Sequence, residues 1–525
     1  MPTITFSKQE LQEYLYAELS DEELQETITM LGTDIDEFGE EITVEMFPDR
    51  PDLLSVPGLA RAINAFTKNP SRKNYEAKKP QQTVIVDKNV RAVRPHTRCL
   101  LARELKLDNK KIDQLIQLQE KLHVTFGRHR KKAAIGIYPL EKITLPITYQ
   151  AKKPSDIRFK PLEAKKEMSA QQLLEEHPTG QAYAHLLAGH KKYPVFTDAK
   201  GTVLSVPPII NSQEAGEVTA STKEVFVEVS GHDPRVLEQA LNIIACALID
   251  MGARIEAMKI QYPKETIISP QLQPIKRATN PDYLLERSGI PTLTELKSSL
   301  RQMDITLEKN TATIPAYRVD FLHDADLIED ALIGFGYANL QPRTPQIYTV
   351  GGFSNDYLRE EKIREVLAGL GMQEVMTYAL TKQGVELANP LTQDYSHLRE
   401  ELLTNVLDVL SKNLSNSYPQ RIFEVGVTFS KDSQAETGVQ ETPAVCAALC
   451  SEETDYTQAR QAVEALAHAM NWELAFSAHE DERFLTGRCA RISGSVEGVV
   501  GEVHPQELAN RRITTPVAAF EIYRK

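Results

Sequence analysis

The stretch KEVFVEVSGHDPRVLEQALNIIACALIDMGA, residues 223–253, decides the fold of the chain around it. Its first half alternates valines with Phe226 and Glu228. Because successive side chains of a strand point to opposite faces, the valines are expected to share one face, and Phe226 and Glu228 the other. Glu228 is thus a carboxylate beside an aromatic residue. We expect it to line a pocket.

The second half of this stretch predicts a long helix. Asp233 is placed to cap its N-terminus, Pro234 suits the first helical position, and Gly252 marks the far end. Upstream, YPVFTDAKGTVLSVPPIINSQEAGEV, residues 193–218, predicts two strands around a turn and then a proline-stiffened loop. Strands and helices therefore mix in this part of the chain.

The length of the chain extends this picture to several domains. A chain of 525 residues exceeds what one hydrophobic core usually supports. The mixed strand and helix patterns, with PRTPQ as a linker, indicate an α/β and α+β multidomain protein. The predicted domains are an N-terminal α+β domain at 1–84, a mixed domain at 85–262, a small unit at 263–345 and a last domain at 346–525.

Composition and charge exclude several classes of protein. The chain is 41% hydrophobic, and its net charge of −13 argues against non-specific coating of nucleic acid. Two local basic segments, GRHRKKAAIG at 127–136 and AKKPSDIRFKPLEAKK at 151–166, are either solvated surface or a nucleic-acid contact. Five scattered cysteines indicate a reduced, intracellular protein. Without a signal-peptide core or membrane-length apolar run, we expect a cytoplasmic location and no membrane contact.

The first domain begins with two helices that the sequence marks by capping boxes. These pair Ser7 with Glu10 and Ser20 with Glu23. In the following proline-rich turn, PDRPD, we expect Asp52 to cap the next helix.

Five carboxylates crowd the stretch IPAYRVDFLHDADLIEDALIGFGY, residues 314–337. They are Asp320, Asp324, Asp326, Glu329 and Asp330. At about 100° per residue, Asp326, Glu329 and Asp330 share one helical face. Asp324 is predicted as the N-cap, and a strand through residues 311–321 would bring Asp320 to the same end. Oxygen ligands without His or Cys suit Mg²⁺ rather than Zn²⁺, with a capped, solvated helix as the alternative.

Common catalytic motifs are absent from the sequence. It contains no GxxxxGK[ST], GxGxxG, HExxH or GxSxG pattern. A nucleotide site of the usual glycine-rich kinds is therefore not expected.

Five ordered motifs across the chain resemble the archaeal and eukaryotic type of phenylalanyl-tRNA synthetase β subunit. They are PDRPDLLSVPGLARA (48–62), GRHRKKAAIGIYPLEKI (127–143), YPVFTDAKGTVLSVPPIINSQEAGEVT (193–219), the acidic stretch 314–337, and NPLTQDYSHLREELLTNVLDVLSKN with QRIFEVG (389–426). The resemblance spans nearly the entire chain. The family has Asn where this chain has Asp49, which puts an amide-specific contact there in doubt.

This resemblance implies a phenylalanine–tRNA ligase made of two α and two β chains. The reaction joins L-phenylalanine to tRNA(Phe) at the expense of ATP, and its site lies on the α subunit. The last domain would be a class II synthetase-like antiparallel-sheet domain without catalytic motifs. Arg421 and Glu424 lie in a strand similar to the class II nucleotide-binding strand, but no glycine-rich strand with a distal Arg follows.

The resemblance also implies two sites in this chain. The metal site would bind Mg²⁺, in a structural or interfacial role, through Asp320, Asp326, Glu329 and Asp330. The editing site would hydrolyse mischarged Tyr-tRNA(Phe) in a pocket formed by Leu204, Ser205, Pro207, Asn211, Ser212, Thr222 and Glu228.

Within that pocket, Glu228 is expected to read the tyrosine hydroxyl. Such a site rejects phenylalanine, because its polar group would be left unpaired. Ser205, Asn211 and Ser212 would orient the ester, although turn capping equally accounts for Ser205 and Asn211. Two other functions stay open: a free-standing mischarged-tRNA deacylase, and a non-enzymatic RNA-binding adaptor.

Overall fold

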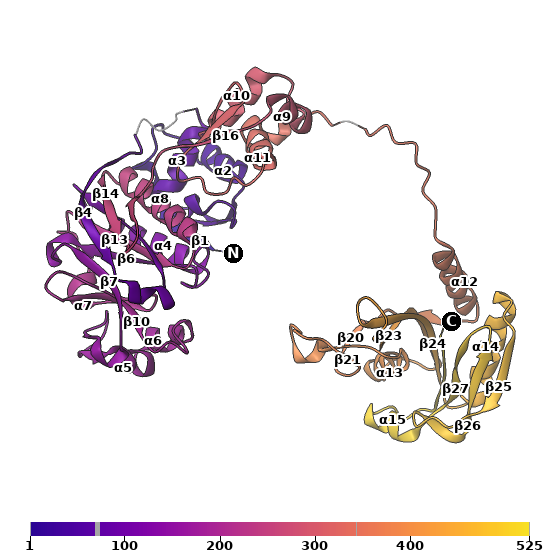
Figure 1. Ribbon diagram of the computed structural model, residues 1–525. Coiled ribbons are helices and arrows are strands. Elements are labelled where there is room, and N and C mark those ends of the chain that lie inside the picture. Colours follow the sequence, from indigo (N-terminus) through magenta and orange to yellow (C-terminus); the bar gives the residue numbers. More distant parts are fainter. Residues whose placement is uncertain (1, 69–73, 343, 524–525) are drawn as a thin grey trace. The chain divides into compact units, whose positions relative to one another are not determined.

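The stretch that decides the fold forms a buried strand and the helix that follows it. The strand is β13 (Val225–Gly231) and the helix is α8 (Pro234–Asp250), capped by Asp233 as predicted. The computed structural model describes residues 2–68, 74–342 and 344–523. These residues fall into two compact units that divide between Thr344 and Pro345 (Figure 1).

A ten-stranded sheet organises the first unit. Its strand order is β12-β11-β10-β7-β4-β14-β5-β13-β6, with β15 paired to β14. The strands are β4 (Ala77–Val86), β5 (His96–Arg103), β6 (Ala133–Pro139), β7 (Ile147–Lys152), β10 (Tyr193–Thr197), β11 (Val203–Val206), β12 (Ile210–Asn211), β13, β14 (Arg254–Gln261) and β15 (Thr266–Ser269). β4 belongs to this sheet, so the predicted boundary at residue 84 falls inside a strand.

Helices of different lengths and a two-stranded ribbon connect the strands of this sheet. In chain order they are η2 (Lys88–Ala92), α4 (Asn109–Val124), η3 (Leu140–Lys142), η4 (Pro154–Asp156), β8 (Arg158–Phe159), β9 (Met168–Ser169), α5 (Ala170–Glu176), α6 (Pro178–Tyr183), η5 (Ala184–Leu186), α7 (Gln213–Gly216) and α8. The two ends of the strand order meet, because the Tyr138 hydroxyl on β6 lies 3.2 Å from Asn211 Oδ1 on β12. The sheet therefore curls around its own interior.

The N-terminal residues form a smaller α+β module. It consists of β1 (Thr3–Ser7), α1 (Lys8–Gln12), α2 (Asp21–Met30), β2 (Asp34–Phe38), β3 (Glu41–Glu45), η1 (Pro51–Leu53) and α3 (Val56–Phe66). Both predicted capping boxes are present. The prediction that Asp52 caps the next helix is wrong. Ser55 is the N-cap of α3, and Asp52 instead forms an ion pair with Arg50 at 2.8 Å.

A second small module follows the large sheet. It contains β16 (Ile275–Ala278), α9 (Pro281–Ser288), α10 (Leu293–Gln302), β17 (Thr306–Glu308), β18 (Thr311–Ile314), α11 (Asp324–Phe335) and η6 (Tyr337–Asn339). β18 ends before Pro315, and an irregular segment leads from there to α11. The predicted strand is thus shorter than expected, because proline cannot donate to a sheet.

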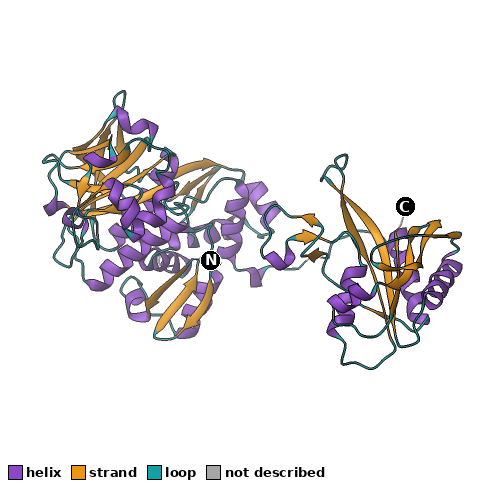
Figure 2. Ribbon diagram, turned by 90° about the horizontal axis from the view of Figure 1, so that it is seen from below, coloured by secondary structure: helices purple, strands orange, loops and turns teal. Residues whose placement is uncertain are grey.

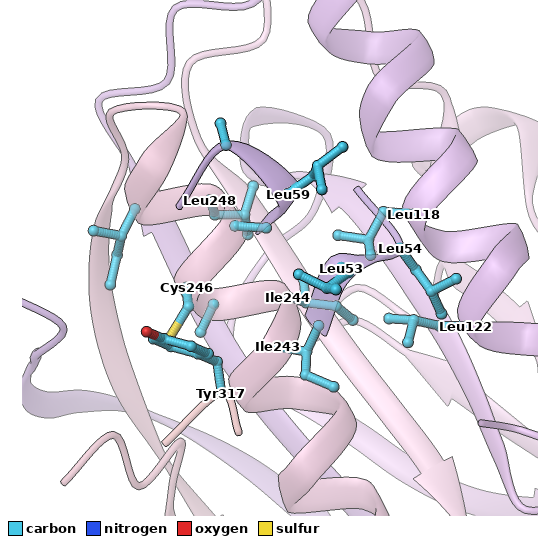
Figure 3. Packing of buried hydrophobic residues seen from close by; sticks show 14 of the residues in the cluster. Leu53, Leu54, Leu59, Leu118, Leu122, Ile243, Ile244, Cys246, Leu248 and Tyr317 are labelled. Carbon is cyan, nitrogen blue, oxygen red and sulfur yellow. The ribbon is translucent and has the colours of Figure 1, made fainter. Parts of the chain in front are cut away.

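One hydrophobic core joins all three parts of the first unit. Leu53 and Leu59 of the N-terminal module pack with Ile244 of α8 and with Leu118 of α4 (Figure 3). Tyr317 of the small module belongs to the same cluster. The valines of β13 face this core, whereas Phe226 faces a second core, as the alternation predicts.

The second unit has a seven-stranded, mainly antiparallel sheet, as predicted for the last domain. Its order is β19-β23-β24-β28-β27-β26-β25, with helices on both faces (Figure 2). The elements are α12 (Asn355–Gly369), β19 (Gln373–Glu374), β20 (Leu380–Thr381), β21 (Val385–Glu386), η7 (Gln393–Tyr395), β22 (His397–Leu398), α13 (Leu403–Lys412), β23 (Gln420–Lys431), β24 (Val439–Cys450), α14 (Tyr456–Met470), β25 (Leu474–Ala478), β26 (Phe484–Gly494), β27 (Glu497–Val503), α15 (Pro505–Asn510) and β28 (Val517–Tyr523). Across the described ranges, every helix is too short or too polar to cross a membrane.

Candidate functional site

A cavity of about 390 Å³ opens where the two ends of the large sheet meet. This volume is typical of small-molecule sites, which span about 300–1,000 Å³. β6, β12 and β13 contribute one side of the cavity, and α4 contributes another. Four of the predicted editing residues line it, namely Ser205, Pro207, Asn211 and Glu228.

The remaining predicted residues lie elsewhere. Leu204 is fully buried in the second core, and Ser212 caps α7 through a hydrogen bond from the Glu214 N–H at 3.2 Å. The Thr222 hydroxyl accepts a hydrogen bond from the Thr219 N–H at 3.2 Å, which closes a local turn. None of these three is among the residues that line the cavity.

Glu228 is held at the floor of the cavity by a residue that sequence reasoning missed. The Tyr138 hydroxyl lies 3.2 Å from Glu228 Oε1 and 3.2 Å from Asn211 Oδ1. Gly136, which pairs with Glu228 across the sheet, leaves room for both groups. A Cβ at Gly136 would lie 2.1 Å from the Tyr138 hydroxyl and 2.6 Å from Glu228 Oε1.

Glu228 also carries an unusual charge state. Burial raises the pKa of Glu228 to about 8, while the Arg94 charge and the Tyr138 hydrogen bond act in the opposite direction. The carboxyl group is therefore mostly protonated at neutral pH. When it is protonated, the Glu228 carboxyl group can donate a hydrogen bond to the Tyr138 hydroxyl oxygen. The Tyr138 hydroxyl can then donate its own proton to Asn211 Oδ1.

Unsatisfied polar atoms gather in this cavity. Glu228 Oε2, Ser205 Oγ and Arg130 Nε are buried and make no hydrogen bond of normal geometry within the described part of the chain, although the Ser230 side chain lies near Glu228 and the Tyr138 hydroxyl near Ser205. Buried polar groups are nearly always paired, so each exception needs an explanation. A ligand that brings a hydroxyl or a carbonyl group into the cavity would satisfy them.

A helix forms the opposite wall through a buried histidine. His123 Nε2 accepts a hydrogen bond from the Ile135 N–H at 2.8 Å, and Nδ1 lies 3.1 Å from Glu120 Oε1. Burial lowers the pKa of His123. Because Nε2 is an acceptor, Nδ1 carries the proton, and this histidine has a structural role in the wall.

The second unit contains a larger hollow of about 1,240 Å³ with a different character. Its arginines are paired, although Glu400, Lys412 and Glu482 of its lining form no ion pair with any described residue. Arg399 contacts Glu424 at 2.6 Å, and Arg483 contacts both Asp481 and Glu401. Among the described residues, no buried side-chain nitrogen or oxygen atom of the second unit lacks a hydrogen bond. We therefore take the smaller cavity as the candidate site.

The acidic helix α11 is capped differently from the prediction. His323, not Asp324, is the N-cap, and its Nδ1 accepts from the Ala325 N–H at 3.1 Å. Asp326 completes the capping box, accepting from the backbone N–H groups of Leu322 and His323 at 2.6 and 2.7 Å. Asp324 instead pairs with Arg277 at 3.1 Å.

A buried arginine, which sequence reasoning also missed, holds two of the predicted metal ligands. Arg318, with a side chain only 1% exposed, contacts Asp320 at 2.7 Å and Asp330 at 2.8 Å. Asp330 lies on the buried face of α11 with Leu327 and not on the predicted acidic face. Burial raises the pKa of Asp330, and the Arg318 charge opposes that rise.

The predicted metal ligands therefore do not converge. Over the described ranges, no group of three or more His, Cys, Asp or Glu residues is arranged to hold a metal ion. The fourth predicted ligand, Glu329, accepts a hydrogen bond from the Tyr337 hydroxyl at 2.6 Å. The carboxylate chemistry suits Mg²⁺, but in this arrangement the Arg318 guanidinium supplies the positive charge beside Asp320 and Asp330.

Comparison with known proteins accounts for the whole chain. Family profiles match in chain order: "Phe-tRNA synthetase beta subunit B1 domain" at residues 1–69, "B3/4 domain" at 78–245, "tRNA synthetase B5 domain" at 279–337 and "Phenylalanyl tRNA synthetase beta chain CLM domain" at 340–523. The phenylalanine–tRNA ligase β subunit of Pyrococcus horikoshii is 36% identical over 550 residues, covering 100% of this chain and 99% of its own. The chain belongs to the phenylalanine–tRNA ligase β-subunit family.

Other members of the phenylalanine–tRNA ligase β-subunit family are similar to this chain to the same degree. The β subunit of Pyrococcus abyssi is 35% identical over 550 residues, covering 100% of this chain and 99% of its own. A crystal structure of an N-terminal fragment of the Pyrococcus horikoshii phenylalanyl-tRNA synthetase β subunit superposes with a TM-score of 0.61 and 35% identity. It covers 64% of this chain and 100% of the fragment. The candidate cavity lies within the part that matches the B3/4 domain of this family.

Proposed function

We propose that this chain is the β subunit of a cytoplasmic phenylalanine–tRNA ligase with two α and two β chains. The complex would join L-phenylalanine to tRNA(Phe) with cleavage of ATP to AMP and diphosphate. The observation that carries the proposal is the similarity to phenylalanine–tRNA ligase β subunits, which runs through the full length of both chains.

Aminoacylation itself is assigned to the α subunit. The class II synthetase-like sheet of the second unit supports this division, because Arg399 and Glu424 satisfy each other in its hollow. Arg421, which the sequence offered as a nucleotide contact, is exposed on β23. Arg399 and Arg483 of the hollow are thus paired with carboxylates of this chain and not free to bind a triphosphate.

Phenylalanine-dependent ATP–pyrophosphate exchange tests this assignment. The chain purified alone is expected to be inactive, and the chain co-expressed with the α subunit of its own genome is expected to be active. Activity of the chain alone would refute the assignment of catalysis to α. Failure to form any complex with α would favour a free-standing deacylase or an RNA-binding adaptor.

We further propose that the cavity in the first unit hydrolyses Tyr-tRNA(Phe). Water would attack the ester carbonyl, the bond to the ribose oxygen would break, and tyrosine and free tRNA would leave. Glu228 Oε2 is the group proposed to bind the phenol hydroxyl, because Oε1 already contacts Tyr138. Ser205 Oγ and Asn211 are proposed to orient the ester end. Ser205 Oγ accepts no hydrogen bond from a backbone N–H of the described residues, which favours this role over turn capping.

A divalent cation is the second proposed feature, at the carboxylates of the small module. We propose Mg²⁺ there, held by Asp320, Asp326, Glu329 and Asp330 in the complex with α. One observation supports it: the four side chains offer oxygen donors only, which are the ligands that Mg²⁺ prefers. Binding would require Asp320 and Asp330 to exchange their contacts with Arg318 for the ion.

Calorimetric titration of the α–β complex with MgCl₂, without nucleotide, checks this proposal. Glu329→Ala is expected to weaken Mg²⁺ binding roughly tenfold or more, because it removes one anionic ligand. Glu308→Ala, which removes an exposed carboxylate of the same module, serves as the matched control. Equal binding by the parent and the Glu329→Ala complex, or no binding by either, would leave Arg318 as the cation of this site.

A further inference from the structure

The turn at residues 127–132, GRHRKK, has an unusual backbone. Arg128, His129 and Arg130 have φ values of 48°, 51° and 65°. Side chains of L-amino acids disfavour this left-handed region, and single residues rather than runs normally visit it. Three in succession persist only where the surroundings hold them, and such positions concentrate at functional sites.

The end of helix α4 holds this backbone in place. The N–H groups of Gly127, His129 and Arg130 donate to the carbonyls of Leu122, Val124 and His123 at 2.7, 3.2 and 3.0 Å. These carbonyls are ones that a helix end otherwise leaves without a partner. The turn is therefore an ordered extension of the helix that forms one wall of the cavity.

Arg130 anchors the turn to the cavity. Its Nη1 donates to the Ile209 carbonyl at 2.7 Å, and Nη2 donates to Glu120 Oε1 at 3.1 Å. The guanidinium also lies 4.4 Å from the ring centre of Tyr183. This arginine has its own partners inside the protein and lines the cavity.

The neighbours of Arg130 have the opposite environment. They are exposed and form no ion pair with any described residue: Arg128, His129, Lys131 and Lys132. Lys165, two residues beyond the lining residue Glu163, is exposed in the same way on a second segment beside the cavity. Unpaired cations beside a cavity are notable in a chain with a net charge of −13.

We propose that this basic turn binds the backbone phosphates of the 3′ single strand of an aminoacyl-tRNA. The inference rests on the proposed hydrolysis in the cavity and identifies how the substrate is held. A space of about 390 Å³ admits the amino acid and the terminal sugar, so the phosphates of the preceding nucleotides must lie outside it. An ordered turn that bears lysine and arginine at the edge of the cavity matches that need.

Removing the three permanent charges tests the inference in the α–β complex. In the variant Arg128→Gln/Lys131→Gln/Lys132→Gln, Arg130 stays in place and the cavity is unchanged. We expect the KM for hydrolysis of Tyr-tRNA(Phe) to rise at least tenfold. The salt dependence of its binding should also become shallower, by about 2 in the slope of log K against log salt concentration. Hydrolysis of tyrosyl-adenosine, an ester without phosphates, should be unchanged.

A matched control removes three exposed lysines from another part of the same unit. Lys78→Gln/Lys79→Gln/Lys88→Gln alters β4 and the turn after it, and the salt slope should match that of the parent. If the basic-turn variant kept both the KM and the salt slope of the parent, the inference would be wrong while the hydrolysis stood. If the parent hydrolysed neither ester, the proposed hydrolysis itself would fail.

Discussion

Replacing Glu228 by alanine is expected to lower the rate of Tyr-tRNA(Phe) hydrolysis by roughly 10- to 100-fold. The physical reason is the loss of the group proposed to bind the phenol hydroxyl, since an unpaired buried polar group costs about 1–3 kcal/mol. The Tyr138 hydroxyl would lose its Glu228 contact as well. Deacylation of Tyr-tRNA(Phe) by the α–β complex measures the effect. Aminoacylation with phenylalanine should be unchanged, because it is assigned to the α subunit.

Glutamine at the same position is the informative control. Because the pKa of Glu228 is about 8, Glu228→Gln preserves the neutral form that dominates at pH 7, so most of the activity should remain. Equal rates for the alanine variant and the parent would refute the role of Glu228.

Stability provides a second measurement on the glutamine variant. The folded-state pKa of this acid lies above its usual value of 4.5, so the native state holds the proton more tightly. The contribution of Glu228 to the free energy of unfolding is therefore greatest below pH 4.5, and it is lost as the pH rises towards 8. Relative to Glu228→Gln, the parent should lose on the order of 4 kcal/mol over that range.

Replacing Arg318 by alanine is expected to destabilise the first unit by roughly 3–5 kcal/mol. The change leaves the Asp330 carboxylate buried without its counter-charge and deprives Asp320 of a two-pronged contact. Breaking a buried ion pair by removing one partner has a cost of this size. Urea unfolding of the full chain, followed by a probe in the first unit, measures it.

Arg301→Ala is the matched control for this prediction. Arg301 is exposed at the end of α10 in the same module, so its removal should change stability by no more than about 0.5 kcal/mol. An Arg318→Ala chain as stable as the Arg301→Ala chain would show that the ion pairs contribute little. Partial recovery of the Arg318→Ala chain in MgCl₂ would show that the ion can replace the guanidinium.

Local sequence patterns predicted the elements of this fold well. The alternation at Phe226 and Glu228, the cap at Asp233 and the boxes at Ser7 and Ser20 each depend on neighbours within a few residues. Such features follow from periodicity and from short-range hydrogen bonds.

Long-range partners account for what the sequence did not predict. Tyr138 lies 90 positions from Glu228, and the pairing of β6 with β13 brings its hydroxyl to that carboxyl group. Arg318 is close to Asp320 in sequence, but its contact with Asp330 depends on where α11 packs. Spacing fixes the angular position of Asp330 on that helix but does not show that this position is buried against Arg318.

The core shared by the three parts of the first unit limits how this protein can be reused. A gene fragment for the large sheet alone would carry α8 without the leucines at 53 and 59 that cover it. Its exposed isoleucines and leucines would then favour self-association over a soluble product. To transfer the cavity into another enzyme, residues 2–342 should be moved together as one fragment. The junction with the new protein should then lie in the segment before α12.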